Sequence, residues 1–195
     1  MRTSECDLVI VGVGGQGVIL ISDVLGRATV LAGKAVCGAE THGMAQRGGS
    51  VINHTRIGCR FSPMVASGGA DLLVALEPAE ALRFAQFLSP TGVTLVNTRP
   101  VLPSTVTSGR AEYPPMKDIL APLKAHSSKV IAMDATALAE TAGSAQAMNV
   151  IMLGALSRYI PLAEDLVLLA LSQVVPPRFL EINKKAFALG KAEVE

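Results

Sequence analysis

The stretch Leu8-Val9-Ile10-Val11-Gly12-Val13-Gly14-Gly15-Gln16-Gly17 decides the fold of this chain. Residues 8–13 are a short, mostly β-branched run that ends among glycines, which is typical of a buried parallel strand. Residues 17–31 then carry apolar side chains at helical spacing. A strand that passes through a glycine-rich turn into a helix is the first part of a strand–helix–strand unit, so we expect an α/β domain.

The same alternation of apolar runs and helical segments continues along the chain. Residues 50–57 alternate only in part, which predicts an edge strand or one arm of an antiparallel pair. Residues 100–122 contain several prolines and predict a long loop with a short helix after Pro115. The alternation predicts one three-layer α/β/α domain with a mostly parallel, Rossmann-like sheet. Further strands are expected at residues 71–76, 92–96 and 129–133, and helices at residues 77–88, 135–142, 147–159, 162–173 and 178 to about 193.

The composition excludes several classes of protein. A chain of 195 residues is long enough for one well-buried core and too short for two ordinary domains. Its formal net charge is +1 and it has no run of lysines or arginines, which argues against a nucleic-acid-binding protein. Half of the residues are hydrophobic and 17% are charged, and this balance predicts that a partner covers part of the surface.

The sequence also predicts a cytoplasmic protein that does not enter a membrane. Glu5 and Asp7 precede the first apolar run, which does not fit a secretory signal. The most apolar run, residues 166–171, is too short to span a bilayer. The three cysteines are an odd number without a CxxC pair, so neither a disulfide framework nor a four-thiolate metal cluster is expected.

The glycine-rich segment at residues 12–17 has three interpretations. Gly12, Gly14 and Gly17 satisfy the pattern G-x-G-x-x-G, whose glycines allow a tight turn and bring a pyrophosphate to a helix N-terminus. A dinucleotide site also needs an acidic residue about 20 residues further on. Glu40 comes later than that and lies in an unusual Glu-Thr-His-Gly context. A tight turn without a ligand, and a loop that serves another ligand or a subunit contact, therefore stay open.

A second cluster, Glu40-Thr41-His42-Gly43-Met44-Ala45-Gln46-Arg47-Gly48-Gly49-Ser50-Val51, places an acid, an imidazole, an amide and a guanidinium among glycines. Arg47 is the main candidate for binding, because a guanidinium holds a carboxylate or phosphate through two parallel hydrogen bonds. A structural interpretation stays open beside it. In that interpretation His42 is a structural histidine, Gln46 and Arg47 cap helices, and Gly48 lies in a turn that enters a strand.

These two clusters and a third segment resemble one protein family. The third segment is Asp71-Leu72-Leu73-Val74-Ala75-Leu76-Glu77-Pro78-Ala79-Glu80-Ala81-Leu82-Arg83, and together the three are similar to the gamma subunits of 2-oxoacid:ferredoxin oxidoreductases. Within that family, residues 40–49 are most similar to the small (beta) subunits of indolepyruvate-type enzymes. Asn97, Asn149 and residues 183–187 extend the similarity to nearly the whole chain, so residues 1–195 are interpreted as one gamma-type domain of the pyruvate/ketoisovalerate ferredoxin oxidoreductases.

The resemblance implies a subunit of an enzyme rather than an enzyme by itself. Its reaction is oxidative decarboxylation of an aryl 2-oxoacid to the aryl-acetyl-CoA, with reduction of ferredoxin. Thiamine diphosphate, magnesium and [4Fe–4S] clusters are expected on a larger (alpha) partner subunit, because this sequence has no thiamine diphosphate motif and only three scattered cysteines. Paired heterodimers are implied, with ferredoxin and coenzyme A acting through the complex and with no cofactor on this chain alone.

The expected site consists of two loops that face the partner or a channel for substrate and coenzyme A. In this hypothesis Arg47 binds an anionic group and Glu40 orients it, and a contact with the partner is the alternative for Arg47. Three competing functions stay open: a gamma subunit of a pyruvate or 2-oxoglutarate enzyme, a free-standing NAD-dependent oxidoreductase, and a non-catalytic assembly module. The candidate site residues are Gly14, Gly15, Gln16 and Gly17 in one loop, and Glu40, His42, Gln46, Arg47 and Gly48 in the other.

Overall fold

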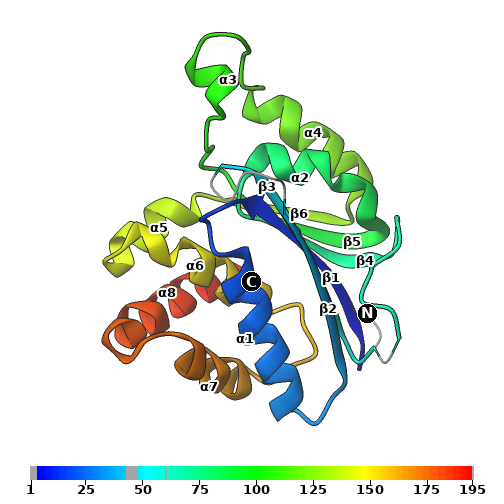
Figure 1. Cartoon of the computed structure of the whole chain (residues 1–195), viewed down its shortest axis with the longest axis vertical. Coiled ribbons are helices and arrows are strands. Elements are labelled where there is room, and N and C mark those ends of the chain that lie inside the picture. The colour runs from blue at the N-terminus through cyan, green and yellow to red at the C-terminus, as the bar shows by residue number, and fades with distance from the viewer. Residues whose placement is uncertain (1–3, 43–47, 60, 195) are drawn as a thin grey trace.

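A six-stranded sheet with helices on both faces forms the protein (Figure 1). The computed structural model describes residues 4–42, 48–59 and 61–194. The strand order is β2-β3-β1-β4-β5-β6. Four strands run parallel to one another: β1 (Cys6–Val13), β4 (Ala70–Ala75), β5 (Leu88–Asn97) and β6 (Lys129–Met133). The predicted three-layer domain with a mostly parallel sheet is confirmed.

The remaining two strands continue the sheet beyond β1. β3 (Ser50–Ile57) is antiparallel to β1 on one side and to β2 (Val36–His42) on the other. The prediction of an antiparallel arm at residues 50–57 is therefore confirmed, but the alternative of an edge strand is wrong. β2 is the edge strand on this side of the sheet, and it was not expected in full, because the glycine at its centre and the polar residues that follow interrupt the apolar pattern.

β1 lies at the centre of the fold and is buried on both faces. Leu8 and Ile10 belong to the larger core, whereas Val9 and Val11 belong to the smaller core on the opposite face of the sheet. Successive residues of a strand point to opposite faces, so a strand buried on both sides needs an uninterrupted apolar run. This is why the stretch at residues 8–11 predicted the fold.

Helices of the C-terminal third and the first helix cover the larger core. All nine residues of α6 are buried, because α6 lies between the sheet and α8. A Cβ on Gly154 would come within 2.1 Å of the Phe187 carbonyl oxygen, and one on Gly190 within 1.8 Å of the Ile151 carbonyl oxygen. The two glycines therefore allow α6 and α8 to approach closely. The helices on this face are α1 (Val18–Leu31), α5 (Ala135–Ala142), η2 (Ala145–Ala147), α6 (Met148–Leu156), α7 (Glu164–Val174), η3 (Pro177–Phe179) and α8 (Leu180–Ala192).

Shorter helices cover the opposite face. Ala81 of α2 (Pro78–Arg83) and Ile119 of α4 (Met116–His126) pack in the smaller core. The single helix expected at residues 77–88 is wrong, because α2 ends at Arg83 and a 3-10 turn, η1 (Ala85–Phe87), leads directly into β5. The helix after Pro115 is longer than expected and contains Pro122.

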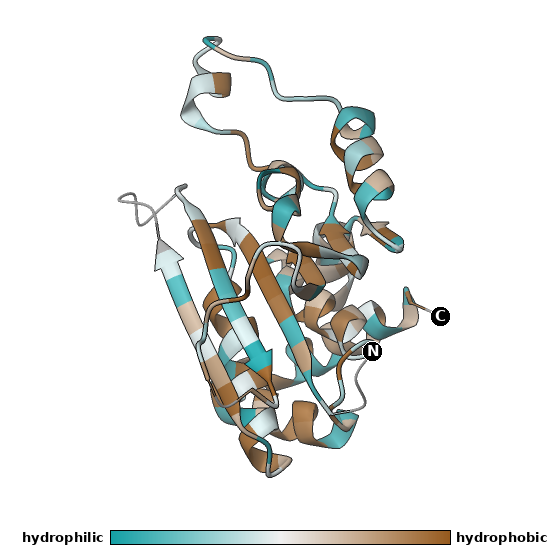
Figure 2. Ribbon diagram, turned by 90° about the vertical axis from the view of Figure 1, so that its right-hand side faces the viewer, coloured by the Kyte–Doolittle hydropathy of each residue, from teal (hydrophilic) through white to brown (hydrophobic). Residues whose placement is uncertain are grey.

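The segment between β5 and α4 projects from the body of the protein (Figures 1 and 2). We call residues 98–115 the arm, and nearly all of them are exposed. The arm contains the short helix α3 (Ser104–Thr107). No helix within the described parts of the chain has both the length and the apolar character that crossing a membrane requires.

Candidate functional site

The two glycine-rich segments meet at the C-terminal end of β1. The Gly14 N–H donates to the Gly49 carbonyl at 2.8 Å, and the Gly48 N–H donates to the Gly14 carbonyl at 3.5 Å. These bonds extend the antiparallel ladder between β1 and β3 beyond the pair Val13 and Ser50. The first predicted loop and the described end of the second therefore lie side by side, and we call residues 12–17 together with residues 48–49 the glycine site.

Gln16 closes the turn of the glycine site with its own side chain. Its Oε1 accepts from the Val13 N–H at 2.8 Å, and its Nε2 donates to the Leu76 carbonyl at 3.0 Å. The amide therefore joins the end of β1 to the residue that follows β4. Because both ends of the amide already have partners, Gln16 shapes the site, and a direct contact of Gln16 with a ligand or partner stays a prediction.

Gly15 and Gly17 adopt backbone conformations that favour glycine. Their φ angles are +101° and +86°, in the left-handed region that side chains with a Cβ rarely adopt. A Cβ on Gly17 would also lie 2.0 Å from Asn149 Nδ2, so the side-chain amide of Asn149 in α6 lies directly against the turn. Within the described residues, no side chain caps the N-terminus of α1. The first N–H groups of a helix attract anions when no cap occupies them.

The structure places the second predicted loop only in part. Glu40 lies on β2 opposite Asn53 and lines a groove of about 300 Å³ between α1 and the sheet, together with Asp23 and Thr55. His42 is the last residue of β2. Gln46 and Arg47 lie outside the described residues, so their predicted roles stay predictions.

Glu77 is a buried carboxylate to which the sequence assigned no role. It precedes α2, and its Oε2 accepts from the Glu80 N–H at 3.0 Å. Its Oε1 accepts from the Tyr113 hydroxyl at 2.6 Å and from the Val101 N–H at 3.3 Å. The Tyr113 hydroxyl in turn accepts from the Ala79 N–H at 3.1 Å. Glu77 therefore fastens both ends of the arm to the start of α2.

Tyr113 shows the electrostatic consequence of this arrangement. Burial raises the pKa of the Tyr113 phenol well above its usual value, and the hydrogen bond to Glu77 and the charge of that carboxylate raise it further. The phenol therefore keeps its proton at neutral pH and donates it to Glu77. Such a donor to a carboxylate makes a strong, short hydrogen bond.

Glu80 is a second buried carboxylate, three residues after Glu77 and within α2. Its Oε2 accepts from the Ser50 hydroxyl, and its Oε1 lies 3.2 Å from Arg83 Nε. Burial raises the pKa of Glu80, and the Ser50 hydrogen bond and the Arg83 charge partly offset this. Ser50 is the first residue of β3 and follows Gly49 directly. Glu77, just before α2, therefore holds the arm, and Glu80 in α2 holds one side of the glycine site.

The sequence contains a pattern that indicates a structural role for these two carboxylates, and no role was assigned to them from it. In the pattern Glu77-Pro78-Ala79-Glu80, the acid Glu77 immediately precedes a helix and Pro78 is the first residue of that helix. A second acid, Glu80, follows three residues after Glu77. This arrangement is typical of helix N-termini, where carboxylates pair with free N–H groups. The partners Ser50 and Tyr113 could not be predicted, because they lie at least 30 residues away along the chain.

Asn97 completes the hydrogen-bonded end of the sheet. Its Nδ2 donates to the Leu76 carbonyl at 3.0 Å, so this carbonyl accepts from both Asn97 and Gln16. Its Oδ1 accepts from the Ala135 N–H at 3.1 Å. Two neutral amides therefore tie the ends of β1, β4 and β5 and the start of α5 together. Buried amides with satisfied partners hold a backbone geometry in place.

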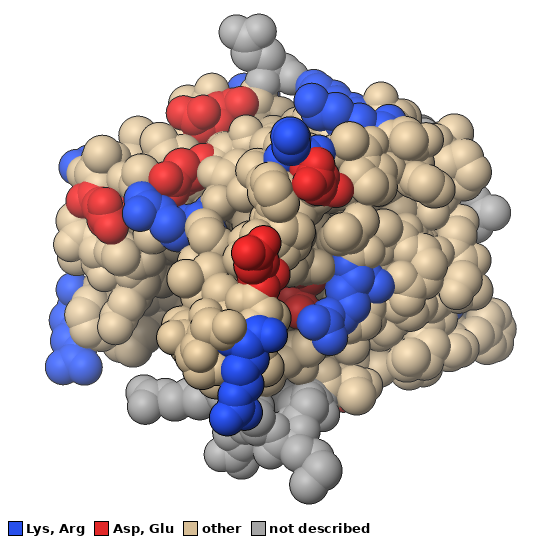
Figure 3. Space-filling model, turned by 90° about the horizontal axis from the view of Figure 1, so that it is seen from above, with Lys and Arg blue, Asp and Glu red and all other residues tan. Residues whose placement is uncertain are grey.

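The glycine site is suited to binding and not to forming a covalent bond with a substrate. Its described side chains are glycines, Val13 and the occupied Gln16, and its remaining polar groups are backbone N–H and carbonyl groups. Among the described residues, no three His, Cys, Asp or Glu side chains lie close enough together to hold a metal ion. On the face seen in Figure 3, acidic and basic side chains are interspersed on a mostly uncharged surface.

Known proteins share both the sequence and the fold of this chain. The indolepyruvate oxidoreductase subunit IorB of Archaeoglobus fulgidus is 44% identical to it over 94% of this chain and 92% of that protein. The IorB subunit of Pyrococcus horikoshii is 40% identical over 95% and 94%. In both proteins the similarity extends over nearly the full length.

Solved structures agree on the fold. The pyruvate oxidoreductase subunit PORC of Thermotoga maritima covers 98% of both chains with a TM-score of 0.74 at 23% identity. A 2-oxoglutarate:ferredoxin oxidoreductase of Magnetococcus marinus covers 97% of this chain but only 31% of its own, with a TM-score of 0.73 at 19% identity. Residues 7–193 match the family described as pyruvate ferredoxin/flavodoxin oxidoreductase. The resemblance found in the sequence is thereby confirmed, and the chain belongs to this family.

Proposed function

We propose that this chain is the small subunit of an indolepyruvate-type ferredoxin oxidoreductase, which converts an aryl 2-oxoacid to the aryl-acetyl-CoA and reduces ferredoxin. The observation that carries the proposal is the 44% identity over 94% of this chain to a protein named an indolepyruvate oxidoreductase subunit. We take residues 1–195 as one gamma-type domain of that enzyme. Its proposed location is the cytoplasm, where the three free cysteines would stay reduced.

The proposal assigns the cofactors to a partner. Oxidative decarboxylation of a 2-oxoacid needs thiamine diphosphate as electron sink and iron–sulfur clusters as one-electron carriers. A [4Fe–4S] cluster takes four thiolates, and this chain has three cysteines. We therefore assign thiamine diphosphate, magnesium and the clusters to a large (alpha) subunit, and we expect paired heterodimers that react with coenzyme A and ferredoxin.

In this proposal the glycine site forms a wall of the channel for substrate and coenzyme A, or the adjoining subunit contact. A Cβ on Gly15 or Gly48 would meet no atom within 4 Å, so a pyrophosphate, a carboxylate or a partner main chain can approach the backbone closely at these two residues. The uncapped N-terminus of α1 adds a positive electrostatic potential there. Arg47 supplies a guanidinium to the same anion, and Glu40 orients it.

The chain's own residues then act by binding and orientation. Gln16 and Asn97 hold the ends of three strands, and Glu80 holds the start of β3 through Ser50. A geometry that is fixed before the ligand arrives would need no reorganisation during the reaction. In this proposal the chain contributes binding and orientation to turnover, and the bond-breaking steps take place on the partner.

Anaerobic co-expression with the large subunit tests the proposal. We expect reduction of an artificial electron acceptor that depends on indolepyruvate and coenzyme A only when both chains are present. Iron and thiamine diphosphate should accompany the large subunit in every purification. A complex that prefers pyruvate or 2-oxoglutarate to aryl 2-oxoacids contradicts the substrate class. Binding of NAD by this chain alone, without effect of the large subunit, contradicts the subunit role.

Arg47 provides the test of the site within the active complex. Arg47→Ala should raise the KM for coenzyme A or for the 2-oxoacid by roughly 10-fold to 100-fold, since a bidentate charged hydrogen bond contributes about 1.5–3 kcal/mol. Arg47→Lys should recover part of the loss. Unchanged turnover and unchanged KM values for both substrates would rule out the anion-binding role and leave the subunit contact.

A further inference from the structure

Two of the three cysteines lie together at the opposite end of β3 from the glycine site. Cys37 is on β2, and Cys59 follows the last residue of β3 after a turn at Gly58, whose φ is +81°. The Cys37 thiol donates to the Cys59 carbonyl at 3.4 Å. Both thiols are half-buried, whereas the third cysteine, Cys6, is 1% exposed.

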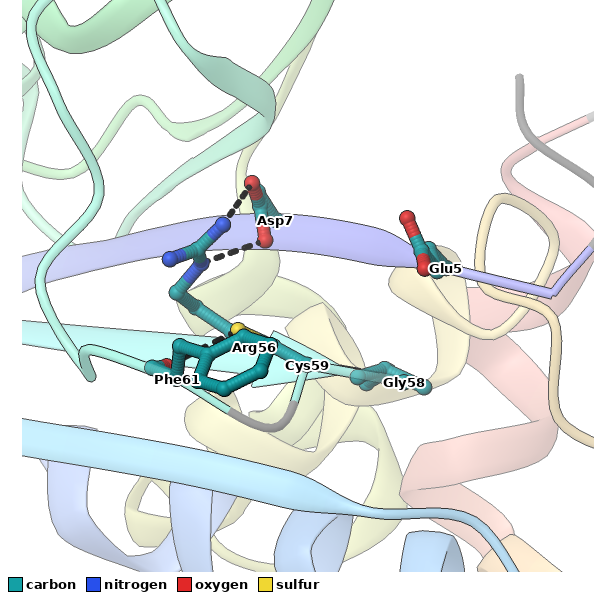
Figure 4. Close-up of a pocket in the computed structure, with 7 residues that line it drawn as sticks. Glu5, Asp7, Arg56, Gly58, Cys59 and Phe61 are labelled. Atoms are coloured by element: carbon teal, nitrogen blue, oxygen red, sulfur yellow. Dashed lines mark hydrogen bonds and ion pairs between the residues drawn. The ribbon is translucent and has the colours of Figure 1, made fainter.

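Cys59 is accessible through a pocket. A hollow of about 230 Å³ is lined by Cys59 together with Asp7, Arg56 and Phe61 (Figure 4). The Cys59 thiol donates to the Phe61 carbonyl at 2.9 Å, and the Phe61 side chain is 82% exposed. Cys59 therefore lines a hollow that a small solute can enter from solvent.

The Arg56 guanidinium lies beside this pair. Its Nε and Nη2 donate to the two oxygens of Asp7 at 2.8 and 3.0 Å. The hydrogen bond to Asp7 raises the pKa of Arg56, and the charge of Asp7 raises it further. Arg56 and Cys59 line the same pocket.

The two sulfurs can reach one another without unfolding the sheet. A Cα atom lies about 2.4 Å from its own carbonyl oxygen, so the Cys59 Cα is at most about 6 Å from the Cys37 sulfur. A disulfide also requires a Cα separation of roughly 4.4–6.8 Å. The bond therefore requires the Cys59 side chain to rotate away from the Phe61 carbonyl and the chain at Cys59 to move toward Cys37.

We propose that Cys37 and Cys59 form a peroxide-reactive dithiol that oxidises to a reversible disulfide. The Cys59 thiolate attacks a hydroperoxide, so that an S–O bond forms, the O–O bond breaks and the alcohol or water leaves with a proton. The Cys37 thiolate then attacks the sulfenic sulfur, and hydroxide leaves and is protonated to water. In total two thiols lose two electrons and two protons, and the peroxide is reduced by the same two electrons.

The geometry assigns different roles to the three cysteines. Cys59 reacts first because it lines the open pocket, and Cys37 resolves the sulfenic acid because its sulfur contacts the main chain of Cys59. Cys6 does not react, since burial raises the pKa of its thiol to about 12 and no solute reaches it. The resulting disulfide closes a loop that contains Glu40, His42 and Arg47. Oxidation would therefore restrain the part of the chain that leads into and out of the second predicted loop.

The test uses the full chain, purified under reducing anaerobic conditions and then treated with one equivalent of hydrogen peroxide. We expect a mass loss of two hydrogens and two fewer alkylated cysteines under denaturing conditions, with both changes reversed by a thiol reductant. Peptide mapping should join Cys37 to Cys59. The readout does not depend on turnover, so it stands or fails separately from the proposed enzymatic function.

Each cysteine supplies a matched variant. Cys6→Ser should behave like the wild type. Cys37→Ser should accumulate a sulfenic acid at Cys59, which a nucleophilic trap captures, and Cys59→Ser should form no disulfide within the chain. The dithiol is ruled out if the wild type keeps all three thiols after peroxide treatment. It is also ruled out if Cys37→Ser or Cys59→Ser loses the same two hydrogens as the wild type. Cys37→Ala and Cys59→Ala repeat the comparison if a serine variant fails to fold.

Discussion

The two ends of β1 are held in different ways. At the C-terminal end, the buried side chains of Asn97, Glu77 and Glu80 and the half-buried amide of Gln16 make hydrogen bonds inside the protein. At the N-terminal end, Asp7 pairs with Arg56, and their side chains are 25% and 23% exposed.

The difference follows from solvent access. A buried polar group that loses its partner pays its full desolvation cost, whereas water replaces a lost partner near the surface. The comparison therefore predicts that substitutions at the C-terminal end of β1 cost more stability than substitutions at the N-terminal end. The hydrogen-bonded C-terminal end of β1 is also the end where the proposed ligand binds. The more exposed N-terminal end is the one beside Cys59, where the proposed oxidation occurs.

The largest effect is expected at Gly17. Gly17→Ala combines a left-handed φ with a Cβ only 2.0 Å from Asn149 Nδ2, so we expect a loss of about 2–4 kcal/mol in unfolding free energy. Gly15→Ala is the matched control, because its φ is also positive but its Cβ would meet no atom within 4 Å. It should lose only about 1–2 kcal/mol. Urea unfolding of the purified chain measures both.

A double variant separates the two causes at Gly17. Asn149→Ala removes the clash and leaves the backbone strain, so Gly17→Ala with Asn149→Ala should cost less than the sum of the two single changes. Equal losses for Gly15→Ala and Gly17→Ala would show that Asn149 does not restrict the turn.

The next effect concerns the ends of the arm. Tyr113→Phe removes the hydroxyl that donates to Glu77 and accepts from the Ala79 N–H. We expect a loss of about 1–2 kcal/mol, because two groups lose a partner at a half-buried position. Hydrogen exchange should rise in the arm and at the start of α2, and it should stay unchanged in β1. Faster exchange over the whole chain would mean that Glu77 holds the fold in general rather than the arm.

Glu80 is predicted to make stability depend on pH. Burial raises its folded pKa above the ordinary value of 4.5, so the folded protein binds a proton more tightly than the unfolded chain. Protonation of Glu80 therefore stabilises the folded state. This stabilisation is complete when the pH is below the pKa that Glu80 has in the unfolded chain, and it is lost as the pH rises through the pKa that Glu80 has in the folded protein. Glu80→Gln should flatten this decline and cost under about 1 kcal/mol at neutral pH, because its amide oxygen still accepts from Ser50.

Unfolding curves recorded between acidic and neutral pH measure this dependence. Glu80→Ala is the control, since it leaves the Ser50 hydroxyl without an acceptor and should cost about 1–2 kcal/mol throughout that range. A Glu80→Gln protein with the wild-type pH profile would show that another group causes the decline.

The sequence revealed the elements whose pattern is local. The strand at residues 129–133 and the helix at residues 135–142 coincide with β6 and α5, because a continuous apolar run and a helical spacing are visible within one segment. The edge position of β2 was missed because strand pairing is not local. An interrupted seven-residue strand becomes recognisable only through its partner β3.

The candidate site was predictable as two parts and not as a whole. Glycine content marked residues 14–17 and 48, but only the ladder between β1 and β3 brings them together. The same holds for Cys37 and Cys59, which were counted as scattered cysteines and lie together because β2 and β3 pair. The sequence shows the chemical type of each residue, whereas which residues lie next to one another depends on contacts between distant segments.

The smallest effect is expected at the N-terminal end of β1. Arg56→Lys replaces two parallel hydrogen bonds to Asp7 by a single donor, yet the loss should stay below about 1 kcal/mol and shrink in high salt, because the pair is partly exposed. Unfolding of both proteins at low and high salt measures the difference. A loss as large as that of Tyr113→Phe, and independent of salt, would remove the distinction between the two ends. The pair would then act as a buried structural contact, and the pocket beside Cys59 would depend on it as firmly as the arm depends on Glu77.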